Sequence, residues 1–295
     1  MTRRTIAVVG TGDMGSAVGA ALVRAGNRVV TDLTGRSAHS RELATRAGLT
    51  NLGSLEAVLG EAEIFLSIVP PAAAAELARR VLATARKSGR SPVFVDCNAV
   101  APATVSAMAE PYGALRIPFV DVGIIGPAPR HGAEPTRFYV SGEARAHVLE
   151  LHAPELALID MGPELGRASA MKMVYAAMNK GTDALYTAVL MAAEQVGVRA
   201  ELMEEFRASQ TQAAERMAAR IPYLAATANR FTGEMREIAT TFAAVGVTPE
   251  FHRGAEWLYA TLARTPLAAE TRASLPKQRS LDEALAVFCS ALPKR

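Results

Sequence analysis

A short apolar run at residues 6–9 leads directly into Gly10, Gly12 and Gly15, and an alanine-rich segment follows at residues 16–25. The run predicts a buried strand and the segment predicts a helix. Gly10 permits a tight turn, Gly12 lets a pyrophosphate approach the backbone, and Gly15 lets the helix pack closely on the strand. The free N–H groups of the first helical turn then face an anion. The stretch therefore predicts a dinucleotide site that also includes Thr11, Asp13 and Met14; a purely structural glycine-rich turn is the alternative.

The end of the next predicted strand, residues 28–32, indicates which dinucleotide binds. An acidic residue there accepts a hydrogen bond from the ribose 2′-hydroxyl of NAD, whereas an arginine can meet the 2′-phosphate of NADP. The chain has both types, since Asp32 is followed by Arg36 and Ser37. Arg36 and Ser37 suit a phosphate, while Asp32 could point away or cap the loop. We therefore expect NADP in preference to NAD, with a solvated loop charge as the alternative role of Arg36.

Strands and helices alternate through the first half of the chain. Further strands are predicted at residues 63–69, 92–96, 117–121, 137–141 and 156–160, and helices at 38–47, 72–87, 102–112 and 144–151. This alternation predicts a mostly parallel, doubly wound α/β sheet, the Rossmann arrangement. Ligands bind such sheets at the carboxyl ends of the strands. The turns at such ends are 10–15, 32–37, 67–71, 96–102 and 121–127.

The pattern changes near residues 162–166. Residues 168–198 contain no proline, are rich in alanine and methionine, and predict one long helix. Shorter helices are predicted at 201–217, 223–228, 233–245, 249–263 and 280–290. We therefore expect a dinucleotide-binding domain over residues 1–164 and an all-helical domain for substrate binding and dimerisation over residues 165–295. The long apolar helix predicts a homodimer, because one domain of this size cannot cover it.

Composition excludes several other classes of function. The formal net charge is only +3, which gives no support to nucleic-acid or membrane-surface binding. No stretch reaches the ~18 apolar residues of a membrane span. Cys97 and Cys289 are too few for a disulfide scaffold and fit a reducing compartment, so we expect a cytoplasmic protein. The histidines have no metal-ligand spacing, and no metal site is expected.

Four stretches resemble the β-hydroxyacid dehydrogenase superfamily, which includes 3-hydroxyisobutyrate and 6-phosphogluconate dehydrogenases. They are the turn at 10–15, the strand end at 67–70, the loop at 96–102 and the start of the long helix at 162–172. Residues 96–99, 36–37 and 168–173 are most similar to an uncharacterised subgroup with a phosphogluconate dehydrogenase-like C-terminal domain of unknown function. The resemblance implies a Rossmann domain, a helical domain and a homodimer. It also implies that Val69, Pro70 and Asn98 contact the cofactor.

The substrate side departs from the pattern of that superfamily. The usual Ser and Thr of the 96–102 loop are Asn98 and Ala99. In the 121–127 loop the usual Ser and second Gly are Ile125 and Pro127, so that only Gly126 remains to meet a substrate carboxylate. Recognition is therefore altered, with fewer hydroxyl donors and a more apolar pocket. Asn98 and Gly126 are the expected substrate contacts of this half.

Lys172 is the expected catalytic residue, a role that the resemblance implies. Hydride transfer at an alcohol carbon needs a base for the hydroxyl proton, and a lysine can serve if burial lowers its pKa. The alternative is a surface lysine that lies along apolar neighbours. The asparagine usual four residues later is Ala176, so Tyr175 is the nearest replacement donor. Asn179, on the same face about 10 Å along the helix, is expected to hold the far end of the substrate.

Three functions stay open from the sequence. The first is an NADP-dependent dehydrogenase or reductase of a hydroxy acid, an oxo acid or a related carbonyl compound. Arg230 or Arg236 of the helical domain would bind the substrate carboxylate, with a surface charge as the alternative, and Arg236 falls where the superfamily has a substrate-side lysine. The second is an imine reductase, against which Lys172 argues. The third is a non-catalytic nucleotide-binding protein.

Overall fold

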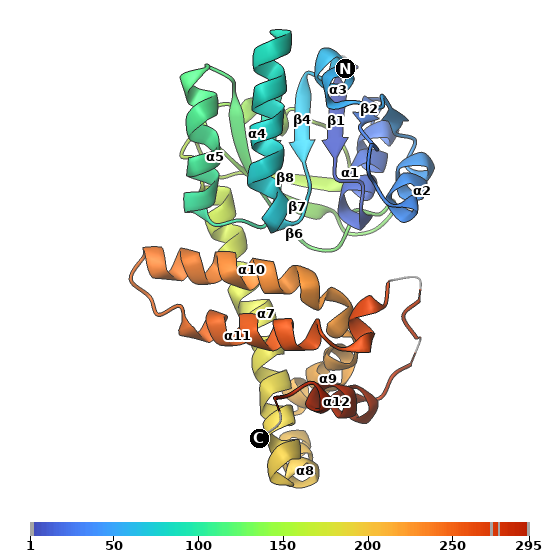
Figure 1. Ribbon diagram of the computed structural model, residues 1–295, viewed down its shortest axis with the longest axis vertical. Helices are drawn as coiled ribbons and strands as arrows, with labels where there is room; N and C mark the ends of the chain where they lie inside the picture. The colour runs from blue at the N-terminus through green and yellow to red at the C-terminus, as the bar shows by residue number, and fades with distance from the viewer. Residues whose placement is uncertain (1–2, 272–273, 277, 294–295) are drawn as a thin grey trace. The chain divides into compact units, whose positions relative to one another are not determined.

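The computed structural model describes residues 3–271, 274–276 and 278–293 (Figure 1). The chain forms two compact units, Met1–Met173 and Val174–Arg295. Their division falls within helix α7 (Arg167–Val196), so the first turns of this helix belong to the first unit. None of the helices in the described ranges is long and apolar enough to cross a membrane.

The first unit contains a sheet with the strand order β3-β2-β1-β4-β5-β6-β7-β8. Its strands are β1 (Thr5–Val9), β2 (Arg28–Thr31), β3 (Thr50–Asn51), β4 (Ile64–Ser67), β5 (Val93–Asp96), β6 (Phe119–Ile125), β7 (Thr136–Ser141) and β8 (Leu156–Asp160). Neighbouring strands are parallel throughout, except that β6 and β7 run antiparallel. The crossover between β3 and β4 turns the order back past β1. The predicted doubly wound Rossmann sheet is therefore confirmed.

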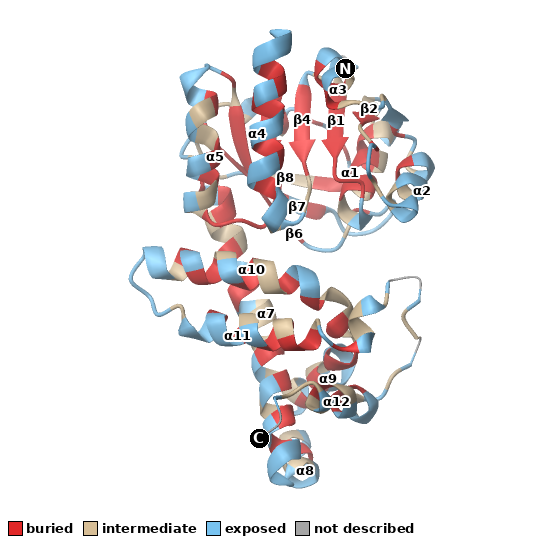
Figure 2. Cartoon of the chain, in the orientation of Figure 1, coloured by how far each residue is buried: buried red, intermediate tan, exposed pale blue. Residues whose placement is uncertain are grey.

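Helices cover both faces of this sheet because its strands are apolar on both sides. Ile6 and Val8 of β1 pack on one face and Ala7 and Val9 on the other, as the period of two along a strand requires. The first face is covered by α1 (Asp13–Arg24), α2 (Ala38–Arg46) and α6 (Ala146–Leu149), and the second by α3 (Leu55–Glu61), α4 (Pro71–Ser88) and α5 (Pro102–Ala114). The central strands are buried along their length (Figure 2).

The second unit is helical, as predicted. After α7 it contains α8 (Arg199–Ser209), α9 (Thr211–Arg220), the 3₁₀ turn η1 (Ile221–Tyr223), α10 (Ala225–Ala244), α11 (Glu250–Leu262), the 3₁₀ turn η2 (Pro266–Ala269) and α12 (Leu281–Ser290). Helices α10 and α11 pack on each other (Figure 1). Phe231 of α10 meets Tyr259 of α11 edge to face, with ring centroids 5.3 Å apart.

Two of the predicted helical boundaries are wrong. The helix expected at 201–217 is interrupted at Gln210, whose backbone leaves the helical region at φ −140° and ψ 53°. The Ser209 hydroxyl donates to the Glu205 carbonyl 2.9 Å away and the Thr211 hydroxyl to the Arg207 carbonyl, contacts that favour a break. The segments expected at 223–228 and 233–245 join into α10, because packing against α11 outweighs the low helix propensity of Gly233.

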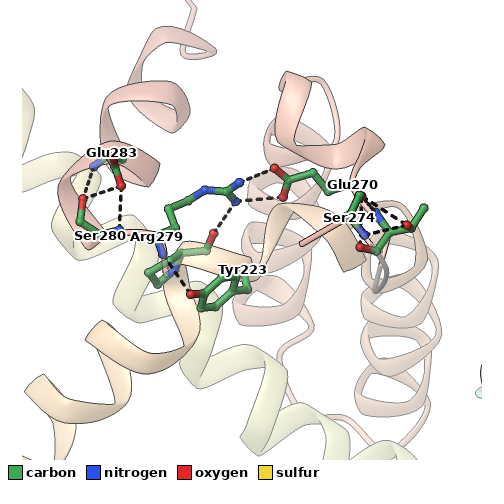
Figure 3. Close-up of polar contacts among 8 residues, drawn as sticks. Tyr223, Glu270, Ser274, Arg279, Ser280 and Glu283 are labelled. Atoms are coloured by element: carbon green, nitrogen blue, oxygen red, sulfur yellow. Dashed lines mark hydrogen bonds and ion pairs between the residues drawn. The ribbon is translucent and has the colours of Figure 1, made fainter. Parts of the chain in front are cut away.

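The start of α12 is tied to η1 by a partly buried arginine. The Arg279 guanidinium pairs with Glu270 and donates to the Pro222 carbonyl 3.0 Å away. The backbone N–H of Arg279 donates to the Tyr223 hydroxyl at 3.1 Å (Figure 3). Ser280 and Glu283 then form a capping box at the first turn of α12. These contacts connect segments distant in sequence within the second unit.

Candidate active site

The turn after β1 fits a pyrophosphate. Gly10 has φ +100°, and a Cβ at this position would overlap the Ile68 carbonyl oxygen. A Cβ on Gly15 would overlap the carbonyl oxygen of Gly10, so α1 passes closer to the turn than any other residue would allow. A Cβ on Gly12 would meet no atom within 4 Å, so the space above it is open. Two glycines therefore shape the turn, and the third leaves its surface accessible.

The first turn of α1 supplies N–H groups to that open space. Gly12 is the N-cap and provides no side-chain acceptor. Of the other residues assigned to this site, Thr11 donates its hydroxyl to the Ser40 carbonyl and Met14 packs against the core. Asp13 is exposed, with His39 4.0 Å away. The backbone of 10–15 is thus the part of the turn that fits an anion.

The loop after β2 separates the roles of its charged residues. The Asp32 carboxylate accepts a hydrogen bond from the Thr34 N–H at 2.9 Å, so it caps its own loop. The Ser37 hydroxyl caps α2 by accepting from the Ser40 N–H. The Arg36 guanidinium makes no hydrogen bond or ion pair with the residues that the structure describes. Asp32, Arg36 and Arg80 of α4 line a cavity of about 500 Å³ beside the end of β1.

Asn98 ties together the ends of β4 and β5. Its amide oxygen accepts from the Val69 N–H at 2.7 Å, and its amide nitrogen donates to the Ser67 hydroxyl at 2.9 Å and to the Asp96 carboxylate. The side chain is buried, and its hydrogen-bonding groups meet protein partners. It therefore fixes the backbone of the 67–70 turn, which ends at Pro70 before α4. A direct contact with cofactor or substrate stays a prediction.

Two buried carboxylates, which sequence reasoning missed, lie side by side under this edge of the sheet. Asp96 of β5 and Asp121 of β6 are register partners on adjacent parallel strands, and both are 0% exposed. Burial, and then the neighbouring Asp121, raise the pKa of Asp96 to about 7. Burial also raises the pKa of Asp121, although hydrogen bonds from Ser169 and Ser141 oppose that shift. A sequence signal existed, since each aspartate directly follows a short apolar run.

Asp121 holds the first turn of α7. It accepts hydrogen bonds from the Ser169 N–H at 2.9 Å, from the Ser169 hydroxyl at 2.6 Å and from the Ser141 hydroxyl at 3.1 Å. The Ser141 hydroxyl in turn accepts from the Ala168 N–H at 3.1 Å. Side chains of β6 and β7 therefore satisfy N–H groups that the helix itself cannot pair. Gly166, the residue before the start of α7, has φ +91°.

Lys172 follows one turn later, and a glycine sets its distance from the sheet. A Cβ on Gly123 of β6 would overlap the Ala168 carbonyl oxygen and would lie 3.2 Å from the Lys172 Cβ. Lys172 is half-buried, and its charge lowers the pKa of both Asp96 and Asp121. Gly126, the residue after β6, has φ +126°. The structure thus brings Lys172, the two buried carboxylates and Gly123 together within the first unit. The predicted turn at 121–127 is wrong for residues 121–125, because they continue β6 and pair with β7.

The remaining predicted residues belong to the second unit. The Tyr175 side chain is 44% exposed, and its hydroxyl has no partner among the described residues. Asn179 donates to the Tyr175 carbonyl 3.2 Å away. Arg236 pairs through two nitrogens with Glu256, at 3.0 and 2.7 Å. Lys180 pairs with Glu234 and lies 4.9 Å from the centroid of the Phe231 ring.

Comparison with known families agrees with this fold. The family described as the NAD binding domain of 6-phosphogluconate dehydrogenase matches residues 5–159. The chain belongs to this NAD-binding dehydrogenase family. A domain of unknown function, DUF1932, matches residues 193–262, which confirms the predicted resemblance in the helical half as well. No curated protein matches the sequence.

Solved structures of similar proteins include both characterised and uncharacterised members. The conserved protein MTH1747 of unknown function, described as similar to 3-hydroxyacid dehydrogenases, is 27% identical, with a TM-score of 0.63 over 88% of this chain and 96% of its own. Mycobacterium tuberculosis 3-hydroxyisobutyrate dehydrogenase with L-serine is 18% identical, with a TM-score of 0.66 over 97% and 99%. The Aspergillus terreus reductive aminase in complex with NADPH and ethyl levulinate is 16% identical, with a TM-score of 0.52 over 92% and 97%.

This NAD-binding dehydrogenase family consists of NAD(P)-dependent dehydrogenases and reductases, and the chain is an enzyme of that class. The glycine turn after β1 has the spacing that is typical of dinucleotide-binding domains. The family takes a small-molecule substrate and a nicotinamide cofactor. Among the described residues there is no group of three or more His, Cys, Asp or Glu side chains that could hold a metal ion.

Proposed function

We propose that the protein is an NADP-dependent dehydrogenase or reductase of a hydroxy acid, an oxo acid or a related carbonyl compound, with Lys172 as the general acid/base. The observation that carries the proposal is the position of Lys172. Lys172 lies one turn into a helix whose start is held by Asp121, the register partner of Asp96 at the carboxyl end of β5, and by Ser141 of β7. In a doubly wound sheet this edge is where ligands bind.

The residues of the first unit suit the parts of NADP. The backbone of the turn at 10–15 and the first N–H groups of α1 would hold the pyrophosphate. Arg36 would meet the 2′-phosphate, because its guanidinium is unpaired among the described residues while Asp32 is occupied by the Thr34 N–H. NADPH in the reductive aminase complex is consistent with this choice. The bound cofactor would supply or accept the hydride.

Lys172 would move the proton that accompanies the hydride. As an ammonium it donates to the carbonyl oxygen during reduction, and as an amine it accepts the hydroxyl proton during oxidation. We assign Asn98 and Gly126 to the substrate side of the first unit, and Tyr175, Asn179 and Arg236 to that of the second. Ile125 in place of a hydroxyl residue favours a substrate with a less polar body than a small hydroxy acid.

Imine reduction is the second candidate activity. The exposed Tyr175 hydroxyl has no partner among the described residues and is available to a substrate nitrogen. The fold shared with the reductive aminase is compatible with this chemistry. Turnover of NADPH with oxo acids, aldehydes and cyclic imines separates the two activities. Reduction of carbonyl compounds alone supports the first proposal, and reduction of cyclic imines alone would replace it.

We also propose a cytoplasmic homodimer. The second unit exposes large apolar side chains, including Met178 at 72% and Phe251 at 79% exposure, together with Leu185 and Trp257. A second copy of the chain would cover such a surface. Cys97 and Cys289 are free thiols, which fits a reducing compartment. Light scattering at micromolar concentration tests the dimer, and a monomer of about the 31.2 kDa chain mass would contradict it.

The cofactor preference is tested with Arg36→Ala. We expect wild-type protein to bind NADPH more tightly than NADH by calorimetry. The variant should lose about 1.5–3 kcal/mol of binding free energy for NADPH, because a charged hydrogen bond is removed. Its binding free energy for NADH should change little. Arg46→Ala is the matched control, since Arg46 lies on α2 in an exposed pair with Glu42. Equal binding of both cofactors by wild-type protein would contradict the preference.

A further inference from the structure

Asp96 and Asp121 differ in how their carboxylates are satisfied. Asp121 accepts from Ser169 and Ser141 through both of its oxygens. Asp96 accepts from the Asn98 amide through Oδ1, while its Oδ2 is buried and has no hydrogen-bond partner among the described residues. A buried carboxylate oxygen that has no donor makes the charged form costly, and so does a second like charge on an adjacent strand. One proton on Asp96 removes both costs.

We infer that Asp96 and Asp121 share a single proton, which Asp96 holds, while the charged Asp121 positions the helix that carries Lys172. The positioning role rests on the proposed function; the location of the proton does not. Asp121 is the member that suits the charge, because its donors include the Ser169 N–H at the positive end of α7. Neither aspartate is assigned to the reacting atoms.

Few other ionisable groups act on the pair. Lys172 of α7 is the cation that stabilises both carboxylates. The Cys97 thiol and the Tyr112 hydroxyl of α5 are neutral neighbours, because burial and then the charge of Asp96 raise the pKa of each. With one proton on Asp96, Lys172 faces one negative charge and not two. Its ammonium then gives up a proton more readily, as a general acid must.

The acid–base state of the pair supports this assignment. Burial and the charge of Asp121 raise the pKa of Asp96 to about 7, so that Asp96 keeps its proton below about pH 7. A carboxyl with a raised folded-state pKa contributes most to stability below its unfolded pKa, and loses that contribution as the pH rises through the folded value. As the pH rises from about 4 to about 7, the contribution of Asp96 to the free energy of unfolding of the wild-type protein should therefore fall.

The location of the proton is tested without any substrate. Infrared spectra near pH 6 should contain a protonated-carboxyl band that Asp96→Asn removes. The exposed control Asp282→Asn should keep the band. The melting temperature of Asp96→Asn should rise relative to wild type as the pH rises from about 4 to about 7, because the amide has no proton to lose. A band that persists in Asp96→Asn, or a difference in melting temperature that is flat with pH, would overturn the proposal.

The positioning role is tested by kinetics. Asp121→Asn should lower kcat about tenfold to a hundredfold with unchanged NADPH affinity, because the first turn of α7 shifts. Asp96→Asn should leave kcat little changed. If Asp121→Asn does not fold, Ser169→Ala removes only the 2.6 Å contact and should lower kcat by a smaller factor. Unchanged kcat in both Asp121→Asn and Ser169→Ala would refute the positioning role. If wild-type protein reduces no carbonyl compound while the infrared result holds, the proposed function fails and the shared proton stands.

Discussion

Helix α7 is held by a buried carboxylate in each unit, and the two carboxylates have opposite surroundings. Asp121 of the first unit accepts from hydroxyl and backbone N–H groups, which are all neutral. Asp183, a residue of α7 in the second unit, is 1% exposed and forms ion pairs with two arginines of α9. The nitrogen–oxygen distances are 2.8 Å to Arg216 and 2.6 Å to Arg220.

The difference separates a place suited to chemistry from a place suited to stability. Neutral groups donate to Asp121, and Lys172 is the cation that acts on it. Two guanidinium groups donate charge-assisted hydrogen bonds to Asp183. Two glycines at which α7 meets its neighbours, Gly123 of β6 and Gly181 of α7 itself, follow the same division. Gly123 has no room for a Cβ, whereas a Cβ on Gly181 would only touch His252 at 3.9 Å.

The largest effect expected is the loss of turnover in Lys172→Ala. Removing a general acid/base lowers the rate by about 10²–10⁴-fold, whereas NADPH affinity should not change because the glycine turn and Arg36 are the groups proposed to bind that cofactor. Stopped-flow or steady-state measurements of NADPH oxidation, with calorimetry for binding, check both expectations.

Lys180→Ala is the matched control on the same helix. Lys180 pairs with Glu234 and contacts the Phe231 ring, so its loss should lower the melting temperature and keep turnover. If Lys172→Ala retained most of its activity, or if Lys180→Ala alone lost it, the division between the two parts of α7 would be wrong.

The second largest effect is expected when the arginine partners of Asp183 are removed. The double variant Arg216→Ala/Arg220→Ala should lose about 3–5 kcal/mol of stability, because a buried carboxylate is left without a counterion. Urea unfolding measures this.

The control for that variant is Arg46→Ala/Arg79→Ala. Both arginines lie in exposed pairs on single helices of the first unit, and such pairs contribute about 0–1 kcal/mol. If Arg216→Ala/Arg220→Ala lost equally little stability, the contrast between Asp183 and Asp121 would disappear.

Local pattern made much of the fold predictable. The spacing of the glycines at 10–15 and the alternation of strands and helices identified the sheet edge where Lys172 and Asn98 lie. The predicted alternative for Asp32, capping of its own loop, is what the structure contains. Strand β3 and helix α3 were not predicted, because segments of two and seven residues are too short for a periodic signal.

The contacts that hold the site depend on register between strands, which one sequence does not reveal. Asp96 and Asp121 are neighbours only because β5 and β6 pair with that register. Ser141 reaches Asp121 through the antiparallel β6–β7 pair. The same reason explains Asn98, whose partners Ser67 and Val69 come from another strand end. The residue type of Asn98 predicted a ligand contact. In the fold, the Asn98 side chain also joins two turns.

The third prediction concerns Gly123→Ala. The added methyl group overlaps the Ala168 carbonyl oxygen, and the backbone must move to relieve it. Overpacking of this kind costs about 1–3 kcal/mol. Because the displaced turn precedes Lys172, kcat should fall as well, with unchanged NADPH affinity. Thermal unfolding and steady-state kinetics test the two effects together, and a variant with wild-type values of both would mean that the approach of α7 to β6 does not matter.

The smallest effect expected has the opposite sign. Gly181 lies in the middle of α7, where glycine destabilises a helix by about 0.5–1 kcal/mol relative to alanine. The Cβ of an alanine would lie 3.9 Å from His252 Nδ1 and 4.0 Å from its Cε1, which is ordinary van der Waals contact. Gly181→Ala should therefore raise the free energy of unfolding by about that amount and leave turnover unchanged. Urea denaturation of Gly181→Ala and Gly123→Ala in one series measures the expected gain and the expected loss of stability. If Gly181→Ala were destabilising by as much as Gly123→Ala, α7 would be packed equally tightly in both units, and its two halves would not differ in the way that their glycines indicate.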